Sequence, residues 1–390
     1  MEADPVDFLG RELEGHVDAA RSDVAAFVGA DPNDLAFIPN ATLGISTVLR
    51  SLSFRPGDEI LVDNHEYNAA RNAATFAAER GGAHVVVAEI PFPIRDRGQV
   101  TEAILARVTP RTRLALISHV TSPTALIFPI AELVTELGRK GIDTLVDGAH
   151  APGMVPLDVA AIGAAYYTGN CHKWLCGPKG SAFLHVRRDR QKEVRPLAIS
   201  HGANSDRTDR SPFRLEFDWT GTADPSAYLA LPTAIRFLGS LLPGGWPALM
   251  ATNRDLALAA RDLLCRAFEV DAPAPDDMLG SMVTVPLPVA ARSSSRPDAG
   301  TIGETLFRTF HIEVPIIGMP PPPDADGEAG RGAPHRFVRI SAQRYNDIGQ
   351  YARLADALLE ILGIDRSDPA LRSGTSAPRS DRAGSPAPRG

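Results

Sequence analysis

Cysteine is scarce in this chain, which has three (Cys171, Cys176 and Cys265) in 390 residues. Three thiols cannot form a disulfide framework, and their irregular spacing lacks the paired CxxC pattern of a zinc site. A reducing cytoplasmic setting without a structural metal is therefore predicted. Positive charge is not in excess either, because 40 basic residues face 47 acidic ones and the net charge is −7. This balance disfavours nucleic acid as a partner.

Long hydrophobic runs are also missing. No stretch approaches the roughly 20 apolar residues that cross a bilayer. The N-terminus, MEADPVDFLG, is acidic where a signal peptide carries positive charge. We therefore expect a soluble protein with no membrane partner. No G-x-G-x-x-G string follows an early strand, which argues against a dinucleotide-binding dehydrogenase.

The composition that is present, 44% hydrophobic and 22% charged, is typical of a globular protein with room for two domains. Short apolar runs predict strands at 35–38, 59–63, 83–90, 113–120, 143–148, 164–168 and 181–186. Amphipathic segments between them predict helices at 41–52, 68–80, 101–108 and 130–140. Nearly continuous apolar strands that alternate with helices indicate a doubly wound α/β fold with a mostly parallel sheet.

The pattern changes near residue 235. A predicted helix at 246–268 is followed by apolar runs at 282–289, 311–319 and 336–341, with helices at 302–310 and 347–362. We therefore predict a large domain over 1–235 and a smaller α+β domain over 236–365. Residues 366–390 are rich in Ser, Pro, Gly and Arg and are predicted to be a disordered tail.

The candidate catalytic residues lie in two sequence strings at the ends of consecutive predicted strands. VDGAH (146–150) ends one predicted strand, and TGNCHKWLCGPKG (168–180) follows the next. Carboxyl ends of parallel strands meet at one crevice, so Asp147 and Lys173 are expected to face each other there. Pyridoxal phosphate (PLP) needs a lysine for its aldehyde and a carboxylate for its pyridine nitrogen. The alternative interpretation is that Asp147 only caps a strand end and that Lys173 is an ordinary solvated side chain.

The residues in these strings favour the PLP-binding interpretation, because they resemble a known family. VDGAH, GNCHKWLCGPKG and RISAQRYN resemble class V aminotransferase-fold enzymes, a group that includes cysteine desulfurases. DNHEY, SHVTSPT and NCHKW resemble the isopenicillin N epimerase-like branch in particular. The likeness runs from Pro5 to Gly363 and implies PLP fold type I, PLP as cofactor and an amino-acid substrate.

The resemblance assigns the reactive centre. It implies that Lys173 holds PLP as a Schiff base, that Asp147 pairs with the pyridinium nitrogen, and that His150 lies near the phenolic oxygen. Arg339, in VRIS, matches the arginine that binds the substrate carboxylate, where a bidentate guanidinium is the physical reason for arginine. Tyr67, in DNHEY, matches the ring that stacks on the pyridine.

Further positions would surround the phosphate. Ala41 and Thr42 open a predicted helix, where N–H groups and a hydroxyl suit an anion, although a plain N-cap at Asn40 or Thr42 is the competing interpretation. By resemblance, Asn170 and His172 contact the phosphate or its surroundings. Thr222, in WTGTADP, matches a segment that reaches the phosphate of the neighbouring subunit, which implies a homodimer with shared sites.

The sequence departs from the family pattern in two places. Desulfurases carry a reactive cysteine on a loop before the C-terminal arginine, but the matching loop, MPPPPDADGEAGRGAPHRF, contains none. Cys171 and Cys176 beside the lysine are instead expected to be packing residues, so persulfide transfer is not expected. Relatives also carry an LNHGSFG-like string before the position of MEADPVDFL. Its absence predicts a truncated start or an altered activity.

Several reactions share this chemistry. An epimerase or racemase would use Lys173 and a second acid–base group, for which His65, Tyr67, His172 and His201 are candidates. A lyase or desulfurase-like elimination, or an aminotransferase, would use the same residues with a different outcome. A non-catalytic PLP-fold protein is expected to have lost Lys173 or Asp147, and both are present.

Overall fold

A computed structural model describes residues 3–288, 298–319 and 335–364. The predicted tail at 366–390 lies outside the described residues, as does the Pro- and Gly-rich stretch 320–334. No helix in the described part is long and apolar enough to cross a membrane.

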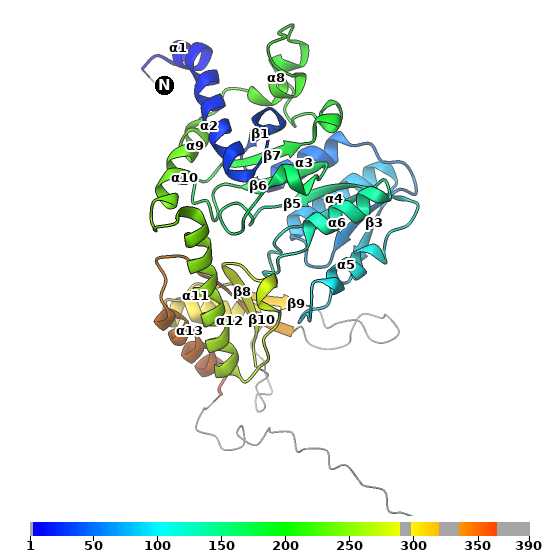
Figure 1. The fold of residues 1–390 in the computed structure, drawn as a ribbon. Helices are drawn as coiled ribbons and strands as arrows, with labels where there is room; N and C mark the ends of the chain where they lie inside the picture. The colour runs from blue at the N-terminus through cyan, green and yellow to red at the C-terminus, as the bar shows by residue number, and fades with distance from the viewer. Residues whose placement is uncertain (1–2, 289–297, 320–334, 365–390) are drawn as a thin grey trace, which may run out of the picture.

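The large sheet has seven strands in the order β1-β7-β6-β5-β4-β2-β3 (Figure 1). Five neighbouring strands run parallel, as predicted, namely β6, β5, β4, β2 and β3. β7 runs antiparallel to both of its neighbours, which corrects the expectation that it belongs to the parallel set. The reason is the connection 171–181, which contains no helix to return the chain to the other end of the sheet. The bounds are β1 Leu35–Ile38, β2 Glu59–Asp63, β3 His84–Ala88, β4 Thr112–Ser118, β5 Asp143–Asp147, β6 Tyr166–Asn170 and β7 Ala182–Val186.

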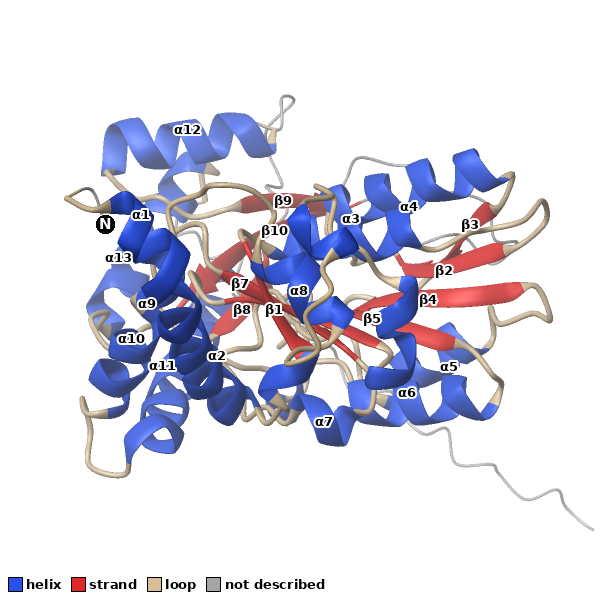
Figure 2. Cartoon of the chain, turned by 90° about the horizontal axis from the view of Figure 1, so that it is seen from above, coloured by secondary structure: helices blue, strands red, loops and turns tan. Residues whose placement is uncertain are grey.

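Helices cover both faces of this sheet, as Figure 2 shows. α3 (Ala41–Ser51) and α4 (Asn68–Gly81) lie on one face, and α5 (Gly98–Leu105), α6 (Ile130–Arg139) and α7 (Val159–Ile162) on the other. Ile60 and Val62 of β2 join one apolar core while Leu61 joins the second. Because successive side chains of a strand point to opposite faces, a strand buried on both sides is apolar throughout.

A second, three-stranded antiparallel sheet has the order β8-β10-β9. β8 spans Met282–Pro286, β9 Ile316–Met319 and β10 His335–Ser341. Helices α11 (Gly245–Phe268), α12 (Ala299–Phe310) and α13 (Ile348–Ile361) accompany it. Of the apolar run at 311–319, only the last four residues form a strand, which pairs with β10.

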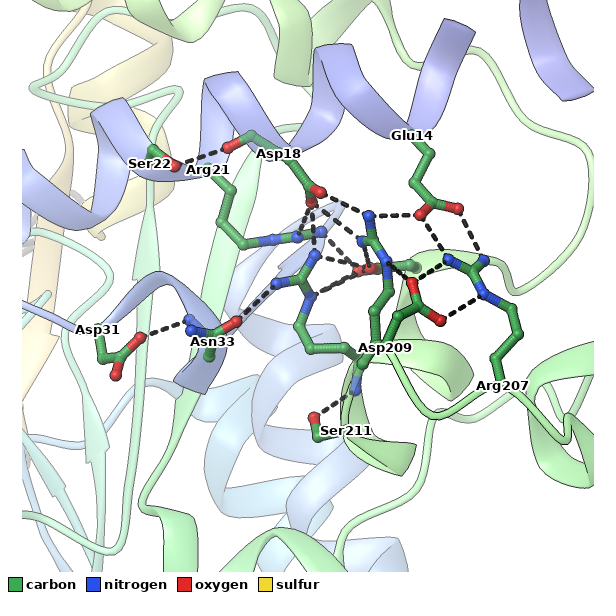
Figure 3. Close-up of polar contacts among 12 residues, drawn as sticks. Glu14, Asp18, Arg21, Ser22, Asp31, Asn33, Arg207, Asp209 and Ser211 are labelled. Atoms are coloured by element: carbon green, nitrogen blue, oxygen red, sulfur yellow. Dashed lines mark hydrogen bonds and ion pairs between the residues drawn. The ribbon is translucent and has the colours of Figure 1, made fainter. Parts of the chain in front are cut away.

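The N-terminal helix was not expected from the sequence. α1 (Pro5–Asp7) and a π-helical turn (Phe8–Glu12) lead into α2 (Leu13–Val28), which ends at Gly29 in the left-handed conformation. α8 (Pro212–Asp218), α9 (Ser226–Leu229) and α10 (Leu231–Gly239) were also missed. Ion pairs join α2 to α8 and the loop before it (Figure 3). This α2–α8 ion-pair cluster consists of Glu14, Asp18, Arg21, Arg207, Asp209, Arg210, Arg214 and Asp218.

Candidate active site

A cavity of about 170 Å³ opens at the carboxyl ends of β4, β5 and β6. Every residue that the resemblance assigns to the cofactor or substrate lines it, except Thr222 and Arg339. The sheet thus brings together side chains that are up to about 130 positions apart in sequence, as expected where parallel strands end. The lining residues are Asn40, Ala41, Thr42, Tyr67, Ser118, Val120, Ser122, Asp147, Ala149, His150, Asn170, His172 and Lys173.

Lys173 points its amine at His150, with 2.9 Å between Lys173 Nζ and His150 Nε2. The indole N–H of Trp174 donates to His150 Nδ1 at 3.4 Å. An indole can only donate, so a neutral His150 that accepts this bond carries its proton on Nε2 and donates it to the unprotonated form of the Lys173 amine. Burial lowers the pKa of Lys173 to about 8, against the opposing pull of Asp147. About a tenth of this amine is therefore unprotonated at pH 7 and able to act as a nucleophile, far more than for a solvated lysine.

Asp147 ends β5 and is almost fully buried. Its Oδ1 accepts a hydrogen bond from the backbone N–H of Ala149 at 2.9 Å. Burial raises the pKa of Asp147, while that N–H and the charge of Lys173 act in the opposite direction. Position 148, directly after Asp147, requires glycine, because a Cβ on Gly148 would lie 2.3 Å from the Tyr167 ring.

The start of α3 is tied to the end of β6. Asn170 Oδ1 accepts the backbone N–H of Ala41 at 2.9 Å, and Asn40 Oδ1 accepts that of Leu43 at the same distance. The predicted N-cap at Asn40 is confirmed, and the N–H of Ala41 already has a partner. The side chain of Thr42 and the positive end of α3 face the cavity.

Two of the four candidate acid–base groups line the cavity, namely Tyr67 and His172. His65 does not, because it is fully buried between Thr124 Oγ1 and the carbonyl of Ile90, and burial lowers its pKa to about 4. His201 is an exposed residue outside the lining. The geometry therefore narrows the second acid–base group to Tyr67 or His172.

Arg339 lies on β10 beside the cavity rather than in its lining. Its Nη1 donates to Ser122 Oγ at 3.1 Å and also to the Ser122 carbonyl, and Ser122 itself lines the cavity. Burial lowers the pKa of Arg339. Within the described residues no carboxylate forms an ion pair with it, and its buried Nε has no hydrogen-bond partner. A partly desolvated guanidinium of this kind is suited to bind a substrate carboxylate.

Thr222 lies on an exposed segment between α8 and α9, away from the cavity lining of its own chain. Neither cysteine beside Lys173 is activated. Cys171 is buried, which raises its thiol pKa to about 12. Cys176 is exposed as a residue, but partial burial of its thiol raises that pKa as well. Thiolates are the reactive form, so the geometry offers no poised sulfur nucleophile.

Sequence reasoning missed a group of polar residues behind Asp147. Glu66 accepts hydrogen bonds from the backbone N–H of Tyr67 at 2.9 Å and from Ser118 Oγ at 3.0 Å. Asp63 ends β2 and is fully buried. The string DNHEY was noted for its tyrosine, and its two carboxyl residues were the overlooked signal.

The donor set matches PLP group by group. An amine of lowered pKa suits an aldehyde, and a buried carboxyl outside any ion pair of the described residues suits a basic ring nitrogen. A helix start with a threonine hydroxyl suits a phosphate. The sequence profile described as "Aminotransferase class-V" matches residues 6–291. The protein belongs to the class V aminotransferase family. It is accordingly a PLP-dependent enzyme.

Individual relatives in this family carry different activities. Isopenicillin N epimerase of Streptomyces clavuligerus is 35% identical over 93% of this chain and 89% of its own length. A probable chloroplastic L-cysteine desulfhydrase of Arabidopsis thaliana is 31% identical over 91% and 76%, respectively. A solved complex of the cystine C–S lyase C-DES with its product cysteine persulfide superposes with a TM-score of 0.70. It is 21% identical, covers 90% of this chain and 87% of that one, and confirms the fold.

Proposed function

We propose that this enzyme breaks the Cα–H bond of an amino acid and returns the proton, as an epimerase or racemase. The observation that carries this proposal is that the amine of Lys173, whose pKa burial lowers to about 8, lines the same cavity as the buried carboxyl of Asp147. Sequence similarity to two isopenicillin N epimerases, which extends over most of both chains, supports the reaction type. PLP, when bound, would take up the electron pair released at Cα.

Each residue has a distinct role in this proposal. Lys173 would hold the cofactor and then remove the Cα proton, and Tyr67 or His172 would return a proton to the opposite face. Asp147 would keep the ring nitrogen protonated. His150 would orient the Lys173 amine and lie at the phenolic oxygen. Ala41, Thr42, Asn170 and His172 would surround the phosphate, and Tyr67 would cover the ring. Arg339 would bind the α-carboxylate, which fixes Cα relative to Lys173.

Elimination at a C–S bond is the second candidate, because relatives of about 30% identity are named L-cysteine desulfhydrases. It would use the same proton removal by Lys173. Loss of the sulfur group would then replace return of the proton.

One incubation separates these reactions. The PLP-loaded enzyme is mixed with a panel of L-amino acids in D₂O, and Cα deuterium, the D-enantiomer, sulfide, pyruvate and keto acids are measured together. Epimerisation predicts deuterium at Cα with accumulation of the other stereoisomer. Sulfide and pyruvate without a D-product would establish elimination instead. Keto acid formation would establish transamination.

We also propose a cytoplasmic homodimer in which Thr222 of one subunit completes the phosphate site of the other. Its exposed position, away from its own cavity, supports this arrangement. A hydroxyl bonded to a phosphate dianion contributes about 1.5–3 kcal/mol. Thr222→Ala should therefore weaken PLP retention about tenfold or more, and Thr222→Ser should largely preserve it.

Subunit mixing tests the cross-subunit part. Thr222→Arg and Lys173→Ala are each expected to be inactive as homodimers. A mixed dimer has one site with both lesions and one with neither, so activity should reappear on exchange. No recovery despite demonstrated exchange would mean that Thr222 does not serve the other subunit.

A further inference from the structure

Three carboxyl groups gather behind the cavity, and we call them the carboxyl floor: Asp63, Glu66 and Asp147. Asp63 ends β2, Glu66 lies in the turn that follows, and Asp147 ends β5. Each is at most 5% exposed. Among the described residues, none of the three forms an ion pair with a lysine, arginine or histidine. Three uncompensated charges in such a place would be very costly, so protons have to be held there.

The Glu66 and Asp147 carboxyls lie close enough to share a hydrogen bond, and Ser118, which donates to Glu66, pairs with Asp147 across β4 and β5. Two carboxylates cannot donate to each other, so one member of this pair carries a proton. Burial and the negative charges of Asp147 and Asp63 raise the pKa of Glu66 well above its usual range. Asp147 instead faces Lys173 and accepts the Ala149 N–H, both of which favour its ionised form. These neighbours favour a proton on Glu66 over one on Asp147.

The remaining neighbours hold the carboxyl floor in place, and the two donors to Glu66 act against the effect of burial on its pKa. Asp63 lies near Arg71 and Asp147 and accepts the backbone N–H of His65 at 2.9 Å, yet burial still raises its pKa to about 7. The Ser118 hydroxyl and the Tyr67 N–H each donate to a Glu66 oxygen, so the carboxyl is held in a fixed orientation.

We propose that Glu66 is a positioning residue whose neutral carboxyl donates a hydrogen bond to Asp147 and keeps that side chain ionised against the ring nitrogen of PLP. A carboxylate that receives such a bond is a weaker base. The shared proton then stays on the ring nitrogen rather than moving to Asp147. The inference rests on the proposed pairing of Asp147 with PLP.

Ring-nitrogen NMR with ¹⁵N-labelled PLP tests the role. Wild type and Glu66→Gln are compared with Glu66→Leu, because the glutamine amide donates without charge whereas leucine cannot donate. We expect matching protonated-nitrogen shifts in wild type and Glu66→Gln, and a displacement toward the unprotonated shift in Glu66→Leu. A wild-type shift in Glu66→Leu would overturn the proposal. So would a Glu66→Gln spectrum like that of leucine, since the carboxyl would then act in its charged form.

Glu59→Gln is the matched control. Glu59 is a buried glutamate at the opposite end of β2, bonded to Arg111 and Thr109, and its replacement should leave the ring-nitrogen shift unchanged. A displacement in this control as large as that in Glu66→Leu would also overturn the assignment.

Infrared spectroscopy of the apoprotein needs no cofactor. The wild-type minus Glu66→Gln difference spectrum should contain a protonated-carboxyl band at neutral pH, and absence of that band would contradict the inference even if Glu66→Leu does not fold. Failure of the proposed function is a separate outcome, seen as no PLP attached to Lys173 in the wild type.

Discussion

The α2–α8 ion-pair cluster and the carboxyl floor both gather charged groups, but they balance charge in opposite ways. In the cluster, Asp18 contacts three arginines (Arg21, Arg210 and Arg214), and Asp218 contacts the same three (Figure 3). In the floor, none of the three carboxyls forms an ion pair among the described residues, and protonation limits their net negative charge. Paired charges can hold two segments together, whereas unpaired buried carboxyls cost stability and are typical of functional sites.

The largest expected effect comes from removing the cation that faces the floor. Lys173→Ala should abolish covalent PLP attachment and lower kcat by roughly 10²–10⁴-fold or more, because the proton-transfer group is lost. Borohydride reduction and peptide mapping locate the attachment in the wild type. The control is Lys179→Ala, an exposed lysine in the same loop, which should keep the label. A phosphopyridoxyl group on any lysine other than Lys173 would refute the assignment.

Asp147→Asn should retain PLP but lower kcat about 10²–10³-fold, because a neutral amide does not stabilise the protonated ring nitrogen. Asp143→Asn is the comparison on the same strand, since Asp143 pairs with Arg187 and Arg190 at the other end of β5. That variant should keep wild-type turnover. Near wild-type kcat in Asp147→Asn would show that the carboxyl is only structural.

Breaking the cluster should affect stability and spare the chemistry. Arg214 is nearly buried, and Arg214→Met leaves Asp18 and Asp218 short of a partner. We expect a loss of about 3 kcal/mol in the free energy of unfolding by urea titration, with kcat of the folded enzyme unchanged. Arg236→Met, which removes an exposed pair with Asp23, should cost less than about 1 kcal/mol. Equal losses in the two variants would contradict the distinction between them.

Arg339→Lys sharpens the comparison at the substrate side. A lysine keeps the charge but not the bidentate fork, so KM for the amino acid should rise about tenfold while PLP absorbance stays the same. Arg344→Lys, an exposed arginine nearby in sequence, should leave KM unaltered. Loss of PLP from Arg339→Lys, or an unchanged KM, would show that its role is misassigned.

A further comparison concerns the pH dependence of the apoprotein's stability. Burial raises the pKa of Asp63 from 3.8 to about 7, so the folded state binds a proton that the unfolded state has released. The contribution of this bound proton to the free energy of unfolding is complete below about pH 4 and is lost as the pH rises through about 7. Relative to Asp63→Asn, wild type should lose about 1 kcal/mol of stability per pH unit within this window. Urea titrations at several pH values measure this difference, and a constant difference would rule out the shift.

Much of the architecture follows from local sequence. The bounds of β1 and β2 are those predicted, because each apolar run stops at residues that favour turns. Asp147 and Lys173 could be placed together because parallel strands end at one edge whatever fills the loops. The Asn40 cap was likewise visible, since its side chain acts on a residue three positions away.

Other features were set only by tertiary contacts. α2 escaped notice because its buried face includes Arg21, whose burial depends on Asp218 nearly two hundred positions away. β7 reads as one more apolar strand, and its reversed direction depends on the helix-free return from β6.

The carboxyl floor shows the same division within the active site. Local pattern marks Glu66 as an ordinary polar residue after a strand, and the string DNHEY contains nothing that distinguishes it from a solvated side chain. Its burial against Ser118 and Asp147 arises where β2, β4 and β5 end side by side. Residue type and spacing therefore determined which chemistry is present at this edge of the sheet. Only the packed sheet decided which carboxyl keeps its proton, because that depends on desolvation and on charges brought together from distant positions.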